Sequence, residues 1–315
     1  MTGPDRGLSK RMFSGRTFRA LLRALLCLAA LPTAPALLAS DAPPAPLPDA
    51  RPFLEAVRDS LHSDQTLLAD YTFTERHTET KLDAKGRPKS TRSEIYEVYP
   101  STRPGRLYRR LVTVDGKPVD PKELAAEDRK HDEKMEKRRI ALENETPDQK
   151  AERLRKEQEE LQRERDVVEE LFRMDEIRVA GRQMVDGRST VLVTFRPRPG
   201  FKPQTKGGKV LQKLAGRAWI DESEKQLVRI DAELLDALGV GPAGVFRLQK
   251  GAHAFFERRR VNGEIWLPAS ARFTGAAKVL LFTLGRLDAR SEYGDYRKFS
   301  VSTSTEIGDV AKTAD

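Results

Sequence analysis

Acidic and hydroxyl side chains gather in one short stretch of this 315-residue chain. Residues 221 to 224 read Asp-Glu-Ser-Glu and lie between the strand-like segments "GRAWI" and "LVRIDAEL". A pair of carboxylates can bind a metal ion or transfer protons, but proton transfer needs a pocket that separates the two pKa values. Aspartate, serine and charged residues are also common in turns. We therefore predict a solvated hairpin turn at 221–224 and not a catalytic site.

Other groups with reactive chemistry lack the spacing that such chemistry needs. The four histidines are His62, His77, His131 and His253. They fall on different predicted elements, and no His-x-His or His-Glu-x-x-His pattern occurs, so a zinc site has no support. "QTKGGKV" lacks the spacing of a phosphate-binding loop, and no Gly-x-Ser-x-Gly nucleophile elbow is present. We predict no catalytic residue, no metal and no cofactor, and hence a protein that is not an enzyme.

The N-terminal segment has the layout of an export signal. One lysine and four arginines between residues 10 and 23 precede the apolar run 24–31, and Ala34-Pro35-Ala36 follows it. This order of charged, apolar and small residues is typical of a secretory signal peptide. The run is far shorter than the ~20 residues that a membrane-spanning helix needs. We predict a cleaved signal over 1–40 and a periplasmic protein, free or associated with the outer membrane; a disordered basic tail is the alternative.

Cysteine and charge exclude several further classes of protein. Cys27, the only cysteine, lies inside the predicted signal, so the exported chain would form no disulfide and no thiolate metal site. Residues 1–36 carry +5 of the net charge of +9, which leaves about +4 for the exported part. That excess is too small to indicate a nucleic-acid partner. The basic segment "RPRPGFKP" at 196–203 leaves contact with a membrane surface open.

Strand patterns cover most of the remaining chain. A Pro/Ala-rich linker (41–50) leads into a first set of elements (51–120), which begins with a helical apolar pattern. A second set (174–302) precedes a tail that we expect to be disordered (303–315). Roughly ten strands joined by short turns predict a large antiparallel sheet. The apolar run "KVLLFTL" at 278–284 predicts a strand covered on both faces.

Residues 121–173 differ in composition from the segments around them. They hold 14 Lys/Arg and 17 Asp/Glu residues. Asp120-Pro121 and Thr146-Pro147 each provide an N-cap and a first-turn proline, which predicts two helices. Leu154 and Leu161 repeat at the seven-residue spacing of a coiled coil, but this stripe is too thin to build a core. We predict an inserted antiparallel helical hairpin, without which the β-domain should still fold; a disordered charged loop is the alternative.

Two segments carry a resemblance to a known family. "GRAWIDESEKQLVRIDAEL" (216–234) and "NGEIWLPASARF" (262–273) resemble bacterial exported proteins of the outer-membrane lipoprotein-sorting family, in the superfamily of the periplasmic lipoprotein carrier and its outer-membrane receptor. The shared elements are a Gly-x-x-Trp-Ile-Asp strand and turn, a Val-Arg-Ile return strand and an Asn-Gly-x-x-Trp-Leu-Pro hairpin. The resemblance covers about 55–120 and 174–302. It implies an incomplete barrel that curls around one or more helices and leaves an apolar concavity for acyl chains.

The expected fold class is therefore mainly β (α+β): an incomplete antiparallel β-barrel wrapped around helix, with the charged helical hairpin inserted. Side chains that alternate along strands share one face of the sheet. The predicted lining residues of the concavity are Val191, Val193, Phe195, Ile220, Val228, Ile230, Ala232 and Leu281. Whether they form a ligand wall or a filled core stays open at this stage.

Two functions are compatible with this fold. The first is non-enzymatic binding of a lipid or lipoprotein acyl chain, because each buried CH₂ contributes roughly 0.8 kcal/mol without any special residue. The alternative is an envelope interaction or sensor protein, in which residues 121–173 dock a protein partner and the sheet is a scaffold. An open apolar groove would favour the first function. A filled interior with an exposed apolar stripe on the helices would favour the second.

Overall fold

The computed structural model describes residues 46–60, 71–83, 85–100, 107–240, 246–279 and 282–298. The predicted signal (1–40), the predicted tail (303–315) and Leu281 lie outside these residues, so the predictions for them stay untested. Among the described residues, no helix is both long and apolar enough to cross a membrane.

One antiparallel sheet contains all the described strands. Their bounds are β1 Tyr71–Leu82, β2 Pro88–Pro100, β3 Leu107–Val114, β4 Lys117–Pro118, β5 Asp175–Val185, β6 Arg188–Pro197, β7 Leu214–Asp221, β8 Leu227–Leu234, β9 Leu238–Val240, β10 Phe246–Leu248, β11 His253–Val261, β12 Ile265–Val279 and β13 Phe282–Lys298. The strand order is β4-β3-β2-β1-β13-β12-β11-β8-β7-β6-β5, with β10 and β9 attached beside β12. The end strands β4 and β5 do not pair, so the sheet stays open, and the predicted incomplete barrel is confirmed.

Tight turns connect neighbouring strands where the sequence offers residues that tolerate a positive φ. Asp115-Gly116 has φ values of 50° and 76°, and Asn262-Gly263 has 53° and 69°. Two successive positive φ angles define the turn whose twist matches that of the flanking strands. Both hairpins follow from the sequence pattern. Asp186-Gly187 adopts the same geometry between β5 and β6.

The apolar run at 278–284 is not a single central strand. Val279 on β12 pairs with Phe282 on β13, so the run is divided between the two arms of a hairpin. That prediction was wrong, because the run contains no Gly, Pro, Asn or Asp to mark where the chain reverses.

The described residues form four helices beside the sheet: α3 Ala50–Ser60, α5 Pro121–Glu143, α6 Pro147–Met174 and α7 Lys206–Leu211. The Asp120 side chain accepts a hydrogen bond from the backbone N–H of Lys122 at the start of α5. Thr146 and Gln149 form a reciprocal capping box at the start of α6. The two helix starts that we predicted are thereby confirmed.

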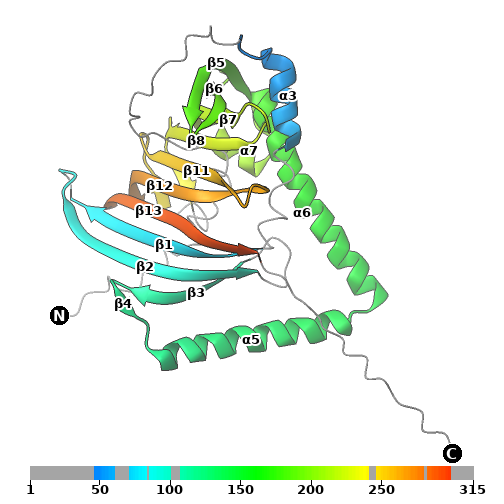
Figure 1. Cartoon of the computed structure of the whole chain (residues 1–315), viewed down its shortest axis with the longest axis vertical. Coiled ribbons are helices and arrows are strands. Elements are labelled where there is room, and N and C mark those ends of the chain that lie inside the picture. The colour runs from blue at the N-terminus through cyan, green and yellow to red at the C-terminus, as the bar shows by residue number, and fades with distance from the viewer. Residues whose placement is uncertain are drawn as a thin grey trace, which may run out of the picture.

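The two long helices do not pack as an antiparallel hairpin. α5 starts beside β3 and β4 at one edge of the sheet, and α6 ends at β5 at the opposite edge (Figure 1). They meet at an angle near residues 144–146. The antiparallel prediction was wrong because the helices lack an apolar seam: α5 buries none of its residues. We call this pair of helices the arm.

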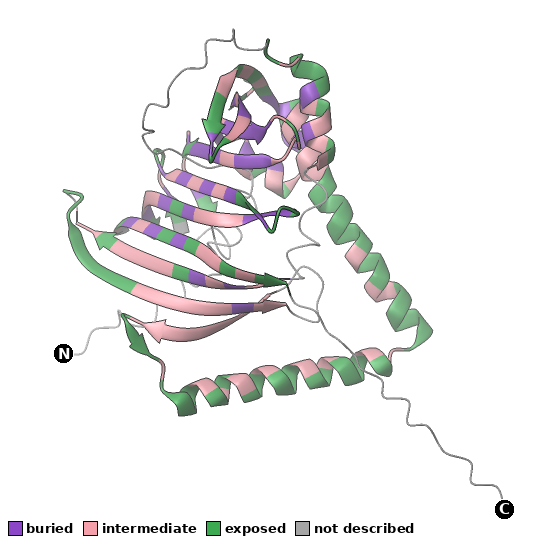
Figure 2. Ribbon diagram, in the orientation of Figure 1, coloured by how far each residue is buried: buried purple, intermediate pink, exposed green. Residues whose placement is uncertain are grey.

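The core lies on one face of the sheet, which we call the inner face; the opposite face is the outer face. α3 and the C-terminal end of α6 cover the inner face over β5–β8. Figure 2 shows buried residues on these strands and on β11–β13, whereas α5 and most of α6 are exposed or intermediate. Phe53 and Val57 of α3 and Met174 of α6 belong to the same buried cluster as the strand residues. The barrel is thus wrapped around helix, as expected.

The glycine pair in "TKGGKV" allows α7 to approach α6 closely. A Cβ atom on Gly208 would lie 2.0 Å from Oε2 of Glu170, and one on Gly207 would lie 2.6 Å from a methyl of Val167. Glu170 is 1 % exposed and accepts hydrogen bonds from the backbone N–H groups of Gln204 and Thr205. The hydrogen bonds of Glu170 therefore connect the C-terminal end of α6 to the loop after β6.

Candidate functional site

Six of the eight predicted lining residues meet on the inner face. They are Val191, Val193, Phe195, Ile220, Ile230 and Ala232. None is more than 8 % exposed, and all six share one buried cluster with Phe53 and Val57 of α3. Their side chains are therefore in contact with a covered apolar interior. Their role as ligand wall stays a prediction.

Val228 does not share that face. Ile220 pairs with Leu227 and Trp219 pairs with Arg229, so Val228 is an extra residue in β8. Such a bulge breaks the two-residue alternation, and Val228 instead packs with Val185, Trp219 and Trp266. The expectation that Val228 lines the same concavity as Ile230 and Ala232 was wrong. Leu281 lies outside the described residues.

α3 covers part of the inner face and contacts it through a small number of side chains. Only Phe53 and Val57 of this helix are buried. The Ser60 hydroxyl donates to the carbonyl oxygen of Lys225 at 2.7 Å, and the Lys225 ammonium lies 5.2 Å from the centre of the Phe53 ring. Burial of two such apolar side chains contributes roughly 3–6 kcal/mol. α3 is therefore held on the inner face by a short apolar stripe and a few polar contacts.

The inner face over β1–β3 is polar, which the sequence analysis did not predict. Glu75 is 8 % exposed and accepts two hydrogen bonds from Arg109, at 2.6 and 2.7 Å. The Arg109 guanidinium lies 3.8 Å from the centre of the Tyr96 ring. His77 Nδ1 lies 2.9 Å from the Ser291 hydroxyl, and burial lowers the pKa of His77. The alternation Phe73, Glu75, His77 in β1 was the available signal.

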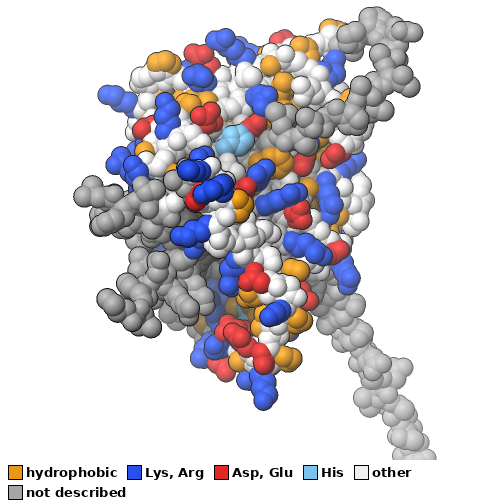
Figure 3. Space-filling view, turned by 90° about the vertical axis from the view of Figure 1, so that its left-hand side faces the viewer, with side chains coloured by type: hydrophobic (Ala, Val, Ile, Leu, Met, Phe, Trp, Pro, Cys, Tyr) orange, Lys and Arg blue, Asp and Glu red, His pale blue; other side chains and the backbone are white. Residues whose placement is uncertain are grey.

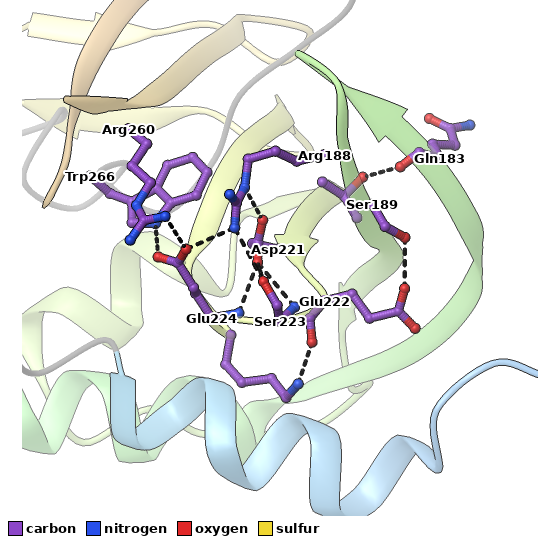
Figure 4. A network of polar contacts seen from close by, with 11 residues as sticks. Gln183, Arg188, Ser189, Asp221, Glu222, Ser223, Glu224, Arg260 and Trp266 are labelled. Atoms are coloured by element: carbon purple, nitrogen blue, oxygen red, sulfur yellow. Dashed lines mark hydrogen bonds and ion pairs between the residues drawn. The ribbon is translucent and has the colours of Figure 1, made fainter. Parts of the chain in front are cut away.

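The acidic stretch at 221–224 forms a turn, as predicted, but its first carboxylate, that of Asp221, is buried (Figure 4). Asp221 is 1 % exposed and accepts hydrogen bonds from Arg188 Nε at 2.6 Å and from the Ser223 hydroxyl at 2.6 Å. The backbone N–H of Glu224 also donates to it, at 2.8 Å. Burial alone would raise the pKa of Asp221, but these donors outweigh burial and lower it to about 2.

The other two carboxylates of the turn are also paired. Glu222 accepts hydrogen bonds from Arg182 at 2.7 Å and from the Ser189 hydroxyl at 2.7 Å. Glu224 accepts from Trp266 Nε1 at 2.8 Å and forms ion pairs with arginines of β6 and β11. Within the described ranges, no group of three or more His, Cys, Asp or Glu side chains could hold a metal ion. The turn therefore joins strands through charge pairing.

Replacement of Asp221 by Asn should destabilise the protein by about 2 kcal/mol at pH 7. Because the folded-state pKa lies below the ordinary value of 3.8, the stabilisation is present above that value and is lost as the pH falls toward 2. Urea unfolding at pH 7 and at pH 2.5 measures the difference, with the exposed turn residue Asp186→Asn as control. An equal loss at both pH values would contradict this account.

No family model matches the chain, and no curated protein matches it. Solved structures do. One is an outer membrane lipoprotein-sorting protein domain from Vibrio parahaemolyticus, with 10 % identity and a TM-score of 0.32, covering 83 % of this chain and 97 % of that chain. Another is a LolA superfamily protein from Nitrosomonas europaea, with 10 % identity and a TM-score of 0.26, covering 80 % of this chain and 94 % of that chain.

A third similar structure is the MucA/MucB complex of Pseudomonas aeruginosa, with 11 % identity and a TM-score of 0.23, covering 78 % of this chain and 99 % of the other. The first two carry the name of the group that the hairpin motifs resemble. At TM-scores this low the superpositions assign no residue and no activity. The strand pairing of this chain by itself defines its open-barrel fold.

Proposed function

We propose that this chain is an exported envelope protein that binds a lipid or lipoprotein acyl chain on the inner face of its open barrel, without catalysis. One observation carries the proposal. A continuous apolar cluster spans β6, β7, β8 and the strands beside them, and over β5–β8 part of its cover is α3, which contributes the buried side chains of Phe53 and Val57 and the partly buried Leu54. The export signal that the sequence predicts at 1–40 supports a periplasmic location.

The ligand would enter by displacing α3. An acyl chain can take the place of Phe53 and Val57 in the buried cluster that also holds Ile230 and Ala232. At roughly 0.8 kcal/mol per CH₂, about four to eight methylene groups match the burial of these two side chains. Fatty acyl chains exceed that length, and the additional methylene groups offset part of the entropy that association costs.

The two halves of the inner face suit an amphiphilic ligand. The apolar half over β6–β8 would hold the chain, and the polar half around Glu75, Arg109 and His77 would face its polar end. Glu75 and Arg109 neutralise each other through two hydrogen bonds. The polar end of a ligand can therefore lie beside them without leaving an unpaired charge buried.

Opening the cover tests this proposal. Phe53→Ala should increase the affinity of the purified, processed protein for a fluorescent fatty acid about tenfold. The reason is that α3 then competes less well with the fatty acid for the inner face. Val228→Ala, a buried apolar change on the outer face, is the matched control and should leave the affinity unchanged. Native mass spectrometry should also find co-purified lipid. An absence of saturable binding in both the wild type and Phe53→Ala would refute the proposal.

A second function, docking of an envelope protein partner by the arm, is favoured by a separate observation. Ile140, Leu154 and Leu161 are 44 %, 44 % and 56 % exposed, and they are three of the five exposed large apolar residues in the described part of the chain. Serine at all three positions should abolish partner capture in crosslinking from intact envelopes while fatty-acid binding is kept. Capture that is unchanged by the triple substitution would exclude this function.

A further inference from the structure

The outer face carries an open groove that neither proposed function uses. It has a volume of about 560 Å³ and is lined by residues of β5, β6, β7, β8 and β11. Figure 3, which views the molecule from the left-hand side of Figure 1, shows Lys/Arg and Asp/Glu side chains interspersed on that side, with one histidine among them. Because the groove lies on the opposite side of the sheet from the apolar cluster, it is independent of acyl-chain binding.

Small residues create the hollow between long cationic side chains. Thr194 on β6 pairs with Arg178 on β5 and with Arg217 on β7, so it lies between these two arginines. Arg196, two residues further along β6, points to the same face. Ala215 on β7 also lines the groove. The threonine and the alanine leave space above the strands, and three guanidinium groups border that space.

Three carboxylates, those of Glu176, Asp231 and Glu233, also line the groove, but two of the three arginines form ion pairs with them. Arg178 pairs with Glu176 at 3.0 Å, but both side chains are well exposed, so water weakens this pair. Arg217 Nη2 donates to Asp231 at 2.8 Å, and His253 Nε2 lies 2.5 Å from the other oxygen of Asp231. Asp231 is thus shared between an arginine and a histidine. No polar partner of the Arg196 side chain is found among the residues that the structure describes.

We propose that this groove binds a phosphate group. Guanidinium groups present paired N–H donors that match the oxygens of a phosphate, and such charge-assisted hydrogen bonds are stronger than neutral ones. Arg178, Arg196 and Arg217 would donate from three sides, and the Thr194 hydroxyl would donate from the floor. The phosphate can belong to an anionic lipid headgroup at the membrane surface or be free phosphate in the periplasm.

The test is binding of inorganic phosphate, by calorimetry, and of vesicles of phosphatidylglycerol in phosphatidylcholine, by sedimentation, to the full processed chain. Arg196→Gln should weaken binding roughly tenfold, because a charged hydrogen bond is lost. Since Arg196 has no ion pair to break among the described residues, this variant should unfold at the wild-type urea concentration. Arg286→Gln, an exposed arginine of β13 outside the groove, is the control and should bind as the wild type does.

Each outcome decides between the alternatives. Binding of free phosphate that falls in Arg196→Gln but not in Arg286→Gln supports a phosphate site. Binding of the vesicles alone, with the same dependence on Arg196, supports the site and identifies the lipid headgroup as the source. Binding that falls equally in both variants would show only general surface charge, and a complete lack of saturable binding would exclude the site.

Discussion

Replacement of residues 121–173 by a short Gly/Ser linker should abolish cooperative folding, contrary to the expectation from the sequence. α5 and α6 are about 35 Å and about 42 Å long at 1.5 Å per residue. They connect β4 and β5, which stand at opposite ends of the sheet, so a short linker cannot bridge the gap. The replacement also removes Glu170, which anchors the loop after β6. We expect a loss of more than about 5 kcal/mol, comparable to the total stability of many domains.

Cleavage of the chain at the bend of the arm is the control. A protease site inserted within residues 144–146 and then cut leaves each helix attached to its own edge of the sheet. At the β3 edge, the His131 ring stacks on Tyr108 at 3.6 Å, and Arg110 donates two hydrogen bonds to Asp128. The cut protein should unfold close to the urea midpoint of the intact one. A linker variant with a wild-type midpoint would contradict this account and restore the hairpin interpretation.

Replacement of Asp175 by Asn should stabilise the protein above pH 7. Asp175 joins α6 to β5 and is 2 % exposed, and within the described residues neither carboxylate oxygen has a hydrogen-bond partner. Burial raises its pKa from 3.8 to about 7, against the opposing charge of Arg198. The folded state therefore holds the proton more tightly than the unfolded state. Stability should fall as the pH rises from about 4 to 7, by about 4 kcal/mol in total.

Asn cannot ionise, so the Asn variant should not lose stability as the pH rises. Its stability relative to the wild type should therefore increase with pH as Asp175 of the wild type ionises. The difference in unfolding free energy should grow by about 1.4 kcal/mol per pH unit between pH 4 and 7 and then stay constant. Urea titrations at pH 4, 5.5, 7 and 8.5 measure it, with Asp186→Asn as the exposed control. A difference that is independent of pH would show that Asp175 is ionised in the folded protein throughout this range.

The sequence was sufficient where structure is set by neighbouring residues. Asp115-Gly116 and Asn262-Gly263 predict tight turns because few residues tolerate a positive φ at both positions. Thr146 and Gln149 predict a helix start because their side chains satisfy backbone N–H groups that have no partner within the helix. Most of the predicted lining residues share a face because strand alternation is regular over β6 and β7.

Features that depend on distant residues were not predictable. Nothing local in β8 marks Val228 as the extra residue of a bulge, since the shift is defined by the pairing with β7. The angle between α5 and α6 follows from the two sheet edges that they connect. Gly207 and Gly208 have a packing role only because Val167 and Glu170 lie against them. The groove bordered by Arg178 and Arg217 likewise needs three strands in register.

Hydrogen exchange of α3 tests the central claim most directly, because the claim is that an acyl chain displaces this helix from the inner face. Exchange of the processed protein is measured with and without a saturating fatty acid. The account predicts that the backbone N–H groups of residues 50–60 lose protection when the fatty acid is bound, while those of β6, β7 and β8 keep or gain it. Unchanged or increased protection of α3 in the bound state would contradict the account.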